Sequence, residues 1–120
     1  MSLGTRIREL RRAKGLTQRG LAALVKLDHT YVSKIENDRL PYTPAVDTLE
    51  ALARALDADE LELLALADKL PSGMRDAAGT PEARAFFRRT TQLVRSPEQW
   101  RSLLQRIERE LAEEGDEAER

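Results

Sequence analysis

The chain has 120 residues, no cysteine, a single histidine and a formal net charge of −1. This composition excludes disulfide bonds, thiol chemistry and zinc sites built from Cys or His clusters, and the length suits one small domain with an appendage. No segment reaches the ~18 to 20 apolar residues of a membrane span, and the first residues lack the apolar run of a signal peptide, so the sequence predicts a cytoplasmic protein.

The charges are distributed unevenly along the chain. Residues 1–44 contain nine Lys or Arg against four Asp or Glu, whereas residues 45–70 contain two against seven. The basic potential therefore belongs to the N-terminal segment and is cancelled directly behind it. This arrangement favours a single contact face for an anionic partner such as a nucleic acid.

The first predicted helix carries an apolar stripe. Leu3, Ile7 and Leu10 recur at helical spacing, basic residues occupy the other faces, and Gly15 ends the helix. We expect this helix to cover the back of the segment that follows.

Residues 16–37 are predicted to form two short helices joined by a tight turn. Thr17 can cap the first helix and Asp28 the second, and apolar residues follow each cap at helical spacing. The outer face of the second helix, residues 28–37, is short, polar and rich in hydrogen-bonding side chains. Such a helix fits the major groove of B-DNA, where its side chains can pair with base edges or phosphates. On composition alone, an ordinary solvated face in a helical bundle remains the alternative interpretation.

The order of residues in this hairpin resembles the helix-turn-helix of the XRE family, the type of phage Cro and lambda repressor. The family pattern is Leu, then Ser or Thr, Gln, Leu-Ala, a hydrophobe and Ile-Glu-Asn. It is matched here by Leu16, Thr17, Gln18, Leu21, Ala22, Val25, Leu27, Ile35, Glu36 and Asn37. The resemblance covers about residues 3–70 and implies a five-helix, lambda-repressor-like DNA-binding domain.

Two positions depart from the family pattern. Lys26 occupies the turn position where the family usually has Gly, and a side chain in a left-handed conformation costs roughly 1 kcal/mol. Gly20 replaces the usual Glu inside the first hairpin helix, which lowers helix propensity by a further ~1 kcal/mol. We expect the turn to form nevertheless, with tertiary packing holding the hairpin together.

The resemblance also implies roles for individual residues. Arg11 is expected to form an internal ion pair with Glu36 that orients the second hairpin helix, and Lys34 is expected to read a base edge. Arg39, in the loop after the hairpin, is either a phosphate contact or a solvated side chain. The full set of expected DNA-binding residues is Gln18, His29, Thr30, Tyr31, Ser33, Lys34, Asn37 and Arg39.

Two further helices complete the predicted domain of residues 1–70. Thr43 and Pro44 are predicted to cap and open a fourth helix. Residues 59–62 match a capping box for a fifth helix, which is expected to run through Leu61, Leu64 and Ala65 to Leu70.

The C-terminal part is predicted to be a linker at residues 71–80, two helices within residues 81–114, and a disordered tail at residues 115–120. The two helices carry more apolar surface than an isolated pair can enclose, so we expect a self-association segment. Its expected dimerisation residues are Phe86, Phe87, Leu93, Trp100, Leu103, Leu104, Ile107 and Leu111.

Charge in this segment is also divided into blocks. Residues 84–106 hold six Arg against one Glu, and residues 107–120 hold six Glu and one Asp against two Arg. The blocks either attract each other across an antiparallel dimer or present an Arg face to DNA, and the aromatic positions favour the dimer.

The sequence therefore predicts an all-α, sequence-specific DNA-binding transcriptional regulator. The specific hypothesis is a homodimeric repressor that binds a palindromic operator with the recognition helix 28–37 in the major groove. The alternative is an antitoxin, or a repressor switched by a metallopeptidase, whose C-terminal helices bind a toxin or another partner protein. An enzyme is disfavoured because a single histidine and the absence of a Gly-rich phosphate loop leave no catalytic constellation, and no cofactor or metal is expected.

Overall fold

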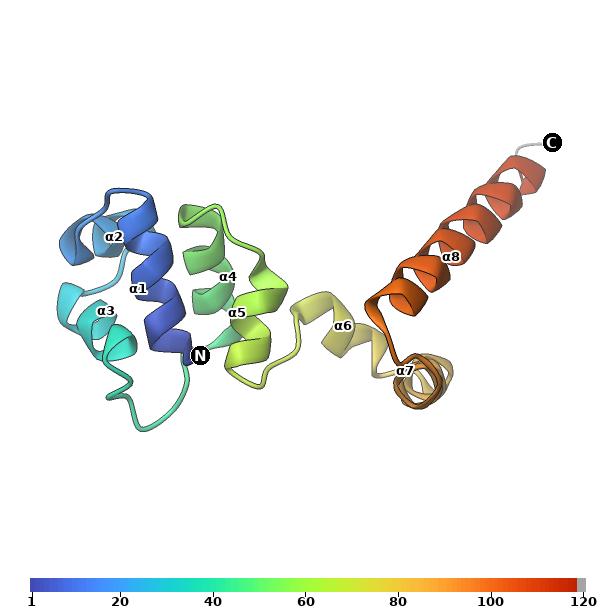
Figure 1. Cartoon of the computed structure of the whole chain (residues 1–120), viewed down its shortest axis with the longest axis horizontal. Coiled ribbons are helices and arrows are strands. Elements are labelled where there is room, and N and C mark those ends of the chain that lie inside the picture. Colours follow the sequence, from blue (N-terminus) through green and yellow to red (C-terminus); the bar gives the residue numbers. More distant parts are fainter. Residues whose placement is uncertain (119–120) are drawn as a thin grey trace. The chain divides into compact units, whose positions relative to one another are not determined.

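The computed structural model describes residues 1–118, and this part of the chain is all helical, as predicted (Figure 1). It divides into two compact units, Met1–Asp76 and the residues from Ala77 onward. None of the helices within residues 1–118 is long and apolar enough to cross a membrane. The helices are α1 (Leu3–Ala13), α2 (Gln18–Val25), α3 (His29–Glu36), α4 (Val46–Ala55), α5 (Glu60–Leu66), α6 (Ser72–Ala77), α7 (Pro81–Leu93) and α8 (Pro97–Ala118).

Helices α1 to α5 enclose one apolar core, which confirms the five-helix domain. Helix α4 packs on α5, α2 packs on α3 and α4, and α1 packs on α3 and α5. Removal of the apolar core side chains from water is the main favourable term in folding the domain. The buried apolar residues are Leu3, Ile7, Leu21, Ala22, Val32, Ile35, Leu49, Leu52, Ala53, Leu56, Leu63, Leu64 and Ala67.

Helices α1 and α3 approach each other at the level of their backbones, and Gly4 makes this possible. A Cβ atom at this position would lie 2.4 Å from the carbonyl oxygen of Ile35 and 2.7 Å from that of Glu36. The contact is reinforced by Asp38, which accepts hydrogen bonds from the Gly4 amide at 3.2 Å and from the Ser2 hydroxyl at 2.8 Å. The start of α1 is therefore tied to the end of α3.

The two predicted caps of the hairpin are confirmed. The Thr17 hydroxyl accepts a hydrogen bond from the Gly20 amide at 2.9 Å, and the Asp28 carboxylate accepts one from the Thr30 amide at 2.8 Å. Lys26 ends α2 in the left-handed conformation, with φ 58° and ψ 42°. The turn thus forms with a side chain at the position that favours glycine.

Replacing Lys26 with glycine is expected to stabilise the domain by about 1 kcal/mol, because the left-handed conformation then carries no Cβ penalty. Urea denaturation of the variant and the parent chain measures the difference. Lys26→Ala is the matched control, since it removes the charge but keeps the Cβ, and it should bring no gain. Equal stabilisation by both variants would assign the effect to charge instead of backbone conformation.

Two predictions about α4 and α5 were wrong. Helix α4 begins at Val46 after an Ala45 N-cap that makes no side-chain hydrogen bond, so Thr43 and Pro44 do not cap and open it. The carbonyl groups of Thr43 and Pro44 accept hydrogen bonds from the Lys69 ammonium, at 3.4 and 2.6 Å. Helix α5 ends at Leu66, before the predicted Leu70, and the chain turns away at Asp68, whose φ of 55° is left-handed. Its buried residues are Leu63 and Leu64.

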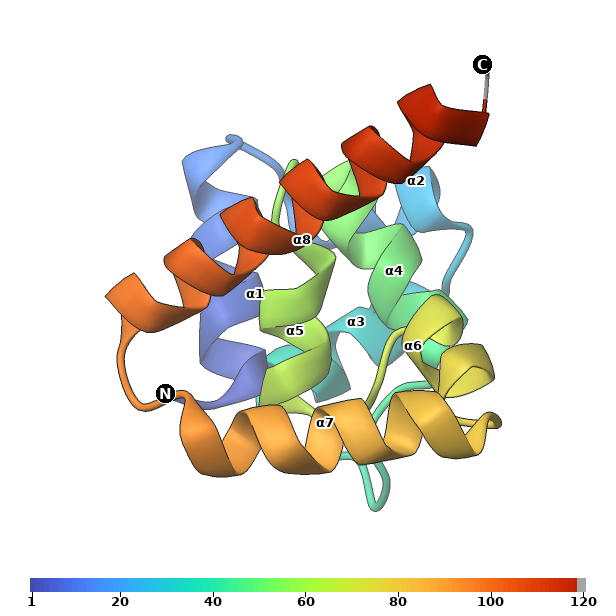
Figure 2. The same ribbon diagram turned by 90° about the vertical axis from the view of Figure 1, so that its right-hand side faces the viewer.

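The chain after the five-helix core differs from the prediction in two places. The predicted linker contains α6, and the predicted disordered tail is helical as far as Ala118, because Ala and Glu are strong helix formers that outweigh Gly115. Residues 119 and 120 lie outside the described part. Figure 2 shows helices α7 and α8 along most of their lengths. The Thr80 hydroxyl accepts a hydrogen bond from the Ala83 amide at the start of α7, and the Ser96 hydroxyl accepts one from the Gln99 amide at the start of α8.

Candidate nucleic-acid interface

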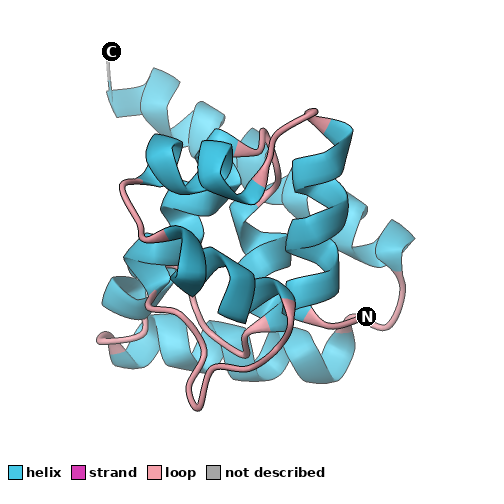
Figure 3. Cartoon of the chain, turned by 90° about the vertical axis from the view of Figure 1, so that its left-hand side faces the viewer, coloured by secondary structure: helices cyan, strands magenta, loops and turns pink. Residues whose placement is uncertain are grey.

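The polar face of α3 forms an open hollow together with the start of α2 and the loop that follows α3. Figure 3 views the domain from the side of α2 and α3. Seven of the eight predicted DNA-binding residues line this hollow, whereas Tyr31 is half-buried and packs against the core. The lining residues are Gln18, His29, Thr30, Ser33, Lys34, Asn37 and Arg39.

The first turn of α3 is organised by Asp28. Its carboxylate accepts hydrogen bonds from both the amide and the hydroxyl group of Thr30, at 2.8 and 2.5 Å. The bond from the Thr30 hydroxyl, followed by the bond from the Thr30 amide, lowers the pKa of Asp28 below its ordinary value. The carboxylate is therefore ionised at neutral pH, and the hydroxyl proton of Thr30 is already committed inside the protein.

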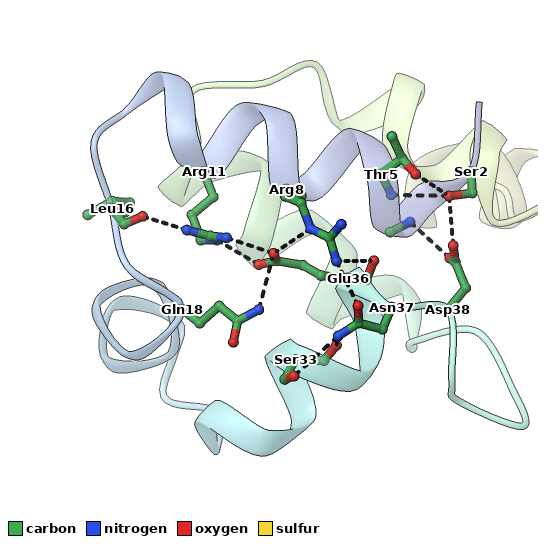
Figure 4. A network of polar contacts seen from close by, with 11 residues as sticks. Ser2, Thr5, Arg8, Arg11, Leu16, Gln18, Ser33, Glu36, Asn37 and Asp38 are labelled. Carbon is green, nitrogen blue, oxygen red and sulfur yellow. Dashed lines mark hydrogen bonds and ion pairs between the residues drawn. The ribbon is translucent and has the colours of Figure 1, made fainter.

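The last turn of α3 is held by the buried carboxylate of Glu36 (Figure 4). The resemblance implied an ion pair with Arg11, and the structure places Arg11 Nε 2.7 Å from Glu36 Oε2 and Arg11 Nη2 2.9 Å from Glu36 Oε1. The Glu36 side chain has no exposed surface. Burial alone raises the pKa of Glu36, but hydrogen bonds from Arg11 and Gln18 and the positive charge of Arg11 outweigh it and lower that pKa.

Gln18 and Asn37, like Thr30, already have partners within the domain. Gln18 Nε2 donates to Glu36 Oε1 at 3.3 Å. The Asn37 amide group donates to the Ser33 carbonyl oxygen at 2.8 Å, while its own oxygen accepts from Arg8 Nη2 at 2.8 Å. Any contact of Asn37 with a phosphate would have to share these groups, so its observed role is to close the end of α3.

Arg8 and Asp38 contribute to the site but were missed by the sequence analysis. Arg8 donates to the carbonyl oxygen of Glu36 at 3.2 Å as well as to Asn37. One signal was present, because Arg8 lies three residues before Arg11 and therefore shares its helix face. Asp38 gave no such signal, since its partners Ser2 and Gly4 are 36 and 34 residues away in the sequence.

Two cations of the hollow remain available for an external partner. Within residues 1–118, the side chains of Lys34 and Arg39 have neither a hydrogen-bonding nor an ionic partner, and both residues are exposed. The same part of the chain contains no group of three His, Asp or Glu residues able to hold a metal ion. The hollow thus offers cations and hydrogen-bonding side chains, which suit phosphates and base edges.

The sequence matches known proteins over this domain. The profile of the family described as "Helix-turn-helix domain" matches residues 2–66. The immunity repressor protein of Bacillus phage phi105 is 45% identical over 56 residues, a match that spans 47% of this chain and 38% of the repressor. The HTH-type transcriptional regulator y4dJ of Sinorhizobium fredii is 38% identical over 73 residues, which span 61% of this chain and 92% of that regulator.

A solved structure resembles the chain over a longer range. A chain in the complex of the SinR protein with the SinI protein superposes on 92% of this chain and 98% of its own length, with a TM-score of 0.50. Its sequence is 23% identical. This likeness concerns the fold alone.

Proposed function

We propose, since the chain belongs to the helix-turn-helix domain family, that it is a sequence-specific DNA-binding transcriptional regulator that places α3 in the major groove. The observation that carries the proposal is the hollow in which α2, α3 and the following loop gather seven polar side chains. The excess of basic residues in this segment supplies attraction to phosphates at long range. Both features support DNA over a small molecule as the partner.

The proposed roles follow from where the side chains lie in the hollow and which of them lack a partner within the domain. Lys34, exposed on α3, donates to a guanine edge, and His29 and Thr30 lie beside it at the start of the same helix. Arg39, in the loop beyond α3, contacts a phosphate. Gln18 and Ser33 are placed for supporting contacts, and Tyr31 supports the helix from the core side.

We further propose that the regulator is a homodimeric repressor with a palindromic operator. The phage relative is an immunity repressor, which supports repression. Helices α7 and α8 carry large apolar side chains that are exposed, and Phe86 and Trp100 are each 45% exposed. This exposure supports an association through this unit. The competing hypothesis is that these helices bind a toxin or a peptidase instead of a second copy of the chain.

Selection of bound sequences from a random DNA pool with the full-length chain tests the main proposal. Enrichment of a palindrome whose half-site centres lie about 34 Å apart is the expected result, because a two-fold dimer places two recognition helices in successive major grooves. Absence of any enriched sequence would refute sequence-specific binding.

Lys34→Ala is expected to weaken operator binding by ~1 to 3 kcal/mol and to relax the preference at one base pair, because a lost base contact removes discrimination. Arg39→Ala, the matched loss of a positive charge in the same hollow, should weaken binding to all sequences about equally and reduce the salt dependence. Fluorescence anisotropy on operator and random duplexes at several salt concentrations measures both effects. An equal loss on the two duplexes for Lys34→Ala would make Lys34 a phosphate contact.

A further inference from the structure

Helix α8 has two apolar faces that differ in exposure. Leu103 is half-buried and lines a hollow shared with the end of α7. Trp100, Leu104 and Leu111 are 45%, 58% and 61% exposed. Within residues 77–118 these three side chains therefore remain to be buried.

The second face has the spacing of a coiled-coil seam. Trp100, Leu104, Ile107 and Leu111 follow one another at intervals of four, three and four residues, which is the heptad pattern of two paired helices. Three of them are exposed, and Ile107 is half-buried. We call these four residues the outer seam. The 22 residues of α8 extend over about 33 Å, and the outer seam leaves three of them before Trp100 and seven after Leu111.

Charges around the outer seam determine the direction of pairing. Residues 108–118 hold six acidic residues and one Arg, whereas residues 97–107 hold two Arg and one Glu. Parallel alignment of two α8 helices would place the two acidic halves side by side, where they repel. Antiparallel alignment places each acidic half against the half that carries the arginines.

We infer that two copies of this chain pair through the outer seam with their α8 helices antiparallel. The inference deepens the proposed function, on which it rests for the role of the dimer. A two-fold axis near the middle of the seam sets Trp100 opposite Leu111 of the second copy and Leu104 opposite Ile107 of the second copy. Because such an interface is isologous, each of these contacts occurs twice.

One charged pair on the flank of the seam makes the arrangement specific. Arg101 and Glu108 lie one heptad apart on the same side of α8, and both are exposed. In the antiparallel pairing, Arg101 of each copy faces Glu108 of the other. In a parallel pairing the two residues lie at different heights and do not meet.

Charge reversal in the full-length chain tests this pairing. Arg101→Glu and Glu108→Arg each turn two attractive contacts into two repulsive ones, so each should raise the dissociation constant of the dimer by about tenfold. The double variant restores opposite charges in exchanged positions and should return to within about threefold of the parent chain. Sedimentation equilibrium, with Trp100 emission followed on dilution, measures the constants.

Matched controls on the opposite face of α8 separate local pairing from net charge. Arg109→Glu and Asp116→Arg make the same changes of charge away from the outer seam and should leave the dimer unchanged. Single reversals without effect, a double variant weaker than either single variant, or a monomeric parent chain would each overturn the inference. The selection of bound DNA sequences tests the proposed function independently of the pairing. A dimer that responds to charge reversal as expected but selects no DNA would refute the proposed function and support the pairing.

Discussion

Replacing Glu36 with alanine is expected to lower the free energy of unfolding by about 3 kcal/mol in the absence of DNA. The variant leaves the Arg11 guanidinium, whose side chain is only 11% exposed, without its carboxylate partner. The remaining acceptor of Arg11 is the Leu16 carbonyl oxygen at 2.8 Å, which cannot neutralise the charge. Urea denaturation monitored by circular dichroism measures the loss.

Glu62→Ala is the matched control for this experiment. Glu62 pairs with Arg6 on the surface, where its side chain is 41% exposed, and exposed ion pairs contribute only about 0 to 1 kcal/mol. A large loss for Glu36→Ala with a small one for Glu62→Ala would establish the internal role. Unchanged melting of the Glu36 variant combined with lost DNA binding would instead place Glu36 at the DNA surface.

The same carboxylate makes the stability dependent on pH. Because the pKa of Glu36 is lowered in the folded domain, the unfolded chain binds this proton more readily. The contribution of Glu36 is therefore complete above the ordinary glutamate value of about 4.3 and is lost as the pH falls through the folded value. The difference in unfolding free energy between the parent chain and Glu36→Gln should accordingly shrink on acidification, and a constant difference would contradict the assignment.

Removal of all residues after Asp76 is expected to weaken operator binding by ~100-fold or more while leaving the first unit folded. The five-helix core lies entirely within Met1–Asp76, so the shortened chain keeps its recognition helix. It loses the helices proposed to join two copies, and with them the high effective concentration of the second half-site. Light scattering gives the oligomeric state, and anisotropy with operator DNA gives the affinity.

Fusion of the shortened chain to an unrelated dimeric coiled coil provides the control. Recovery of most of the affinity would show that the C-terminal helices act by linking two domains, without contacting DNA themselves. A shortened chain that remains dimeric and binds with full affinity would contradict the proposal, and the helices would then serve a toxin, a peptidase or another partner.

The sequence predicted the local features of the domain well. The Thr17 and Asp28 caps depend on residues close together in the chain. The left-handed turn at Lys26 and the five-helix core, which joins residues from Leu3 to Ala67, were implied by the family resemblance. The predicted end of the fifth helix at Leu70 was wrong, because the apolar pattern continues to Leu70 while the backbone leaves the helix after Leu66 and is left-handed at Asp68.

The long-range polar contacts were not accessible from spacing. The pairing of Arg11 with Glu36 came from the family resemblance, since 25 residues separate the two. Asp38 and Gly4 have a similar relation across 34 residues, and no pattern in the sequence marked either of them. The exposed groups of Lys34 and Arg39 were anticipated, but the engagement of Asn37 by Arg8 became visible only when α1 and α3 were brought together.

The close approach of α1 and α3 at Gly4 bears on the kinetics of DNA binding. With backbone packed on backbone and Asp38 tied to both helices, α3 cannot tilt without displacing α1 and the core beneath it. The ordering entropy of the α3 backbone is therefore lost when the domain folds and not when it meets DNA. Encounter with the duplex then requires no rearrangement of α3 before productive docking, so diffusion and electrostatic attraction limit the association rate of each domain.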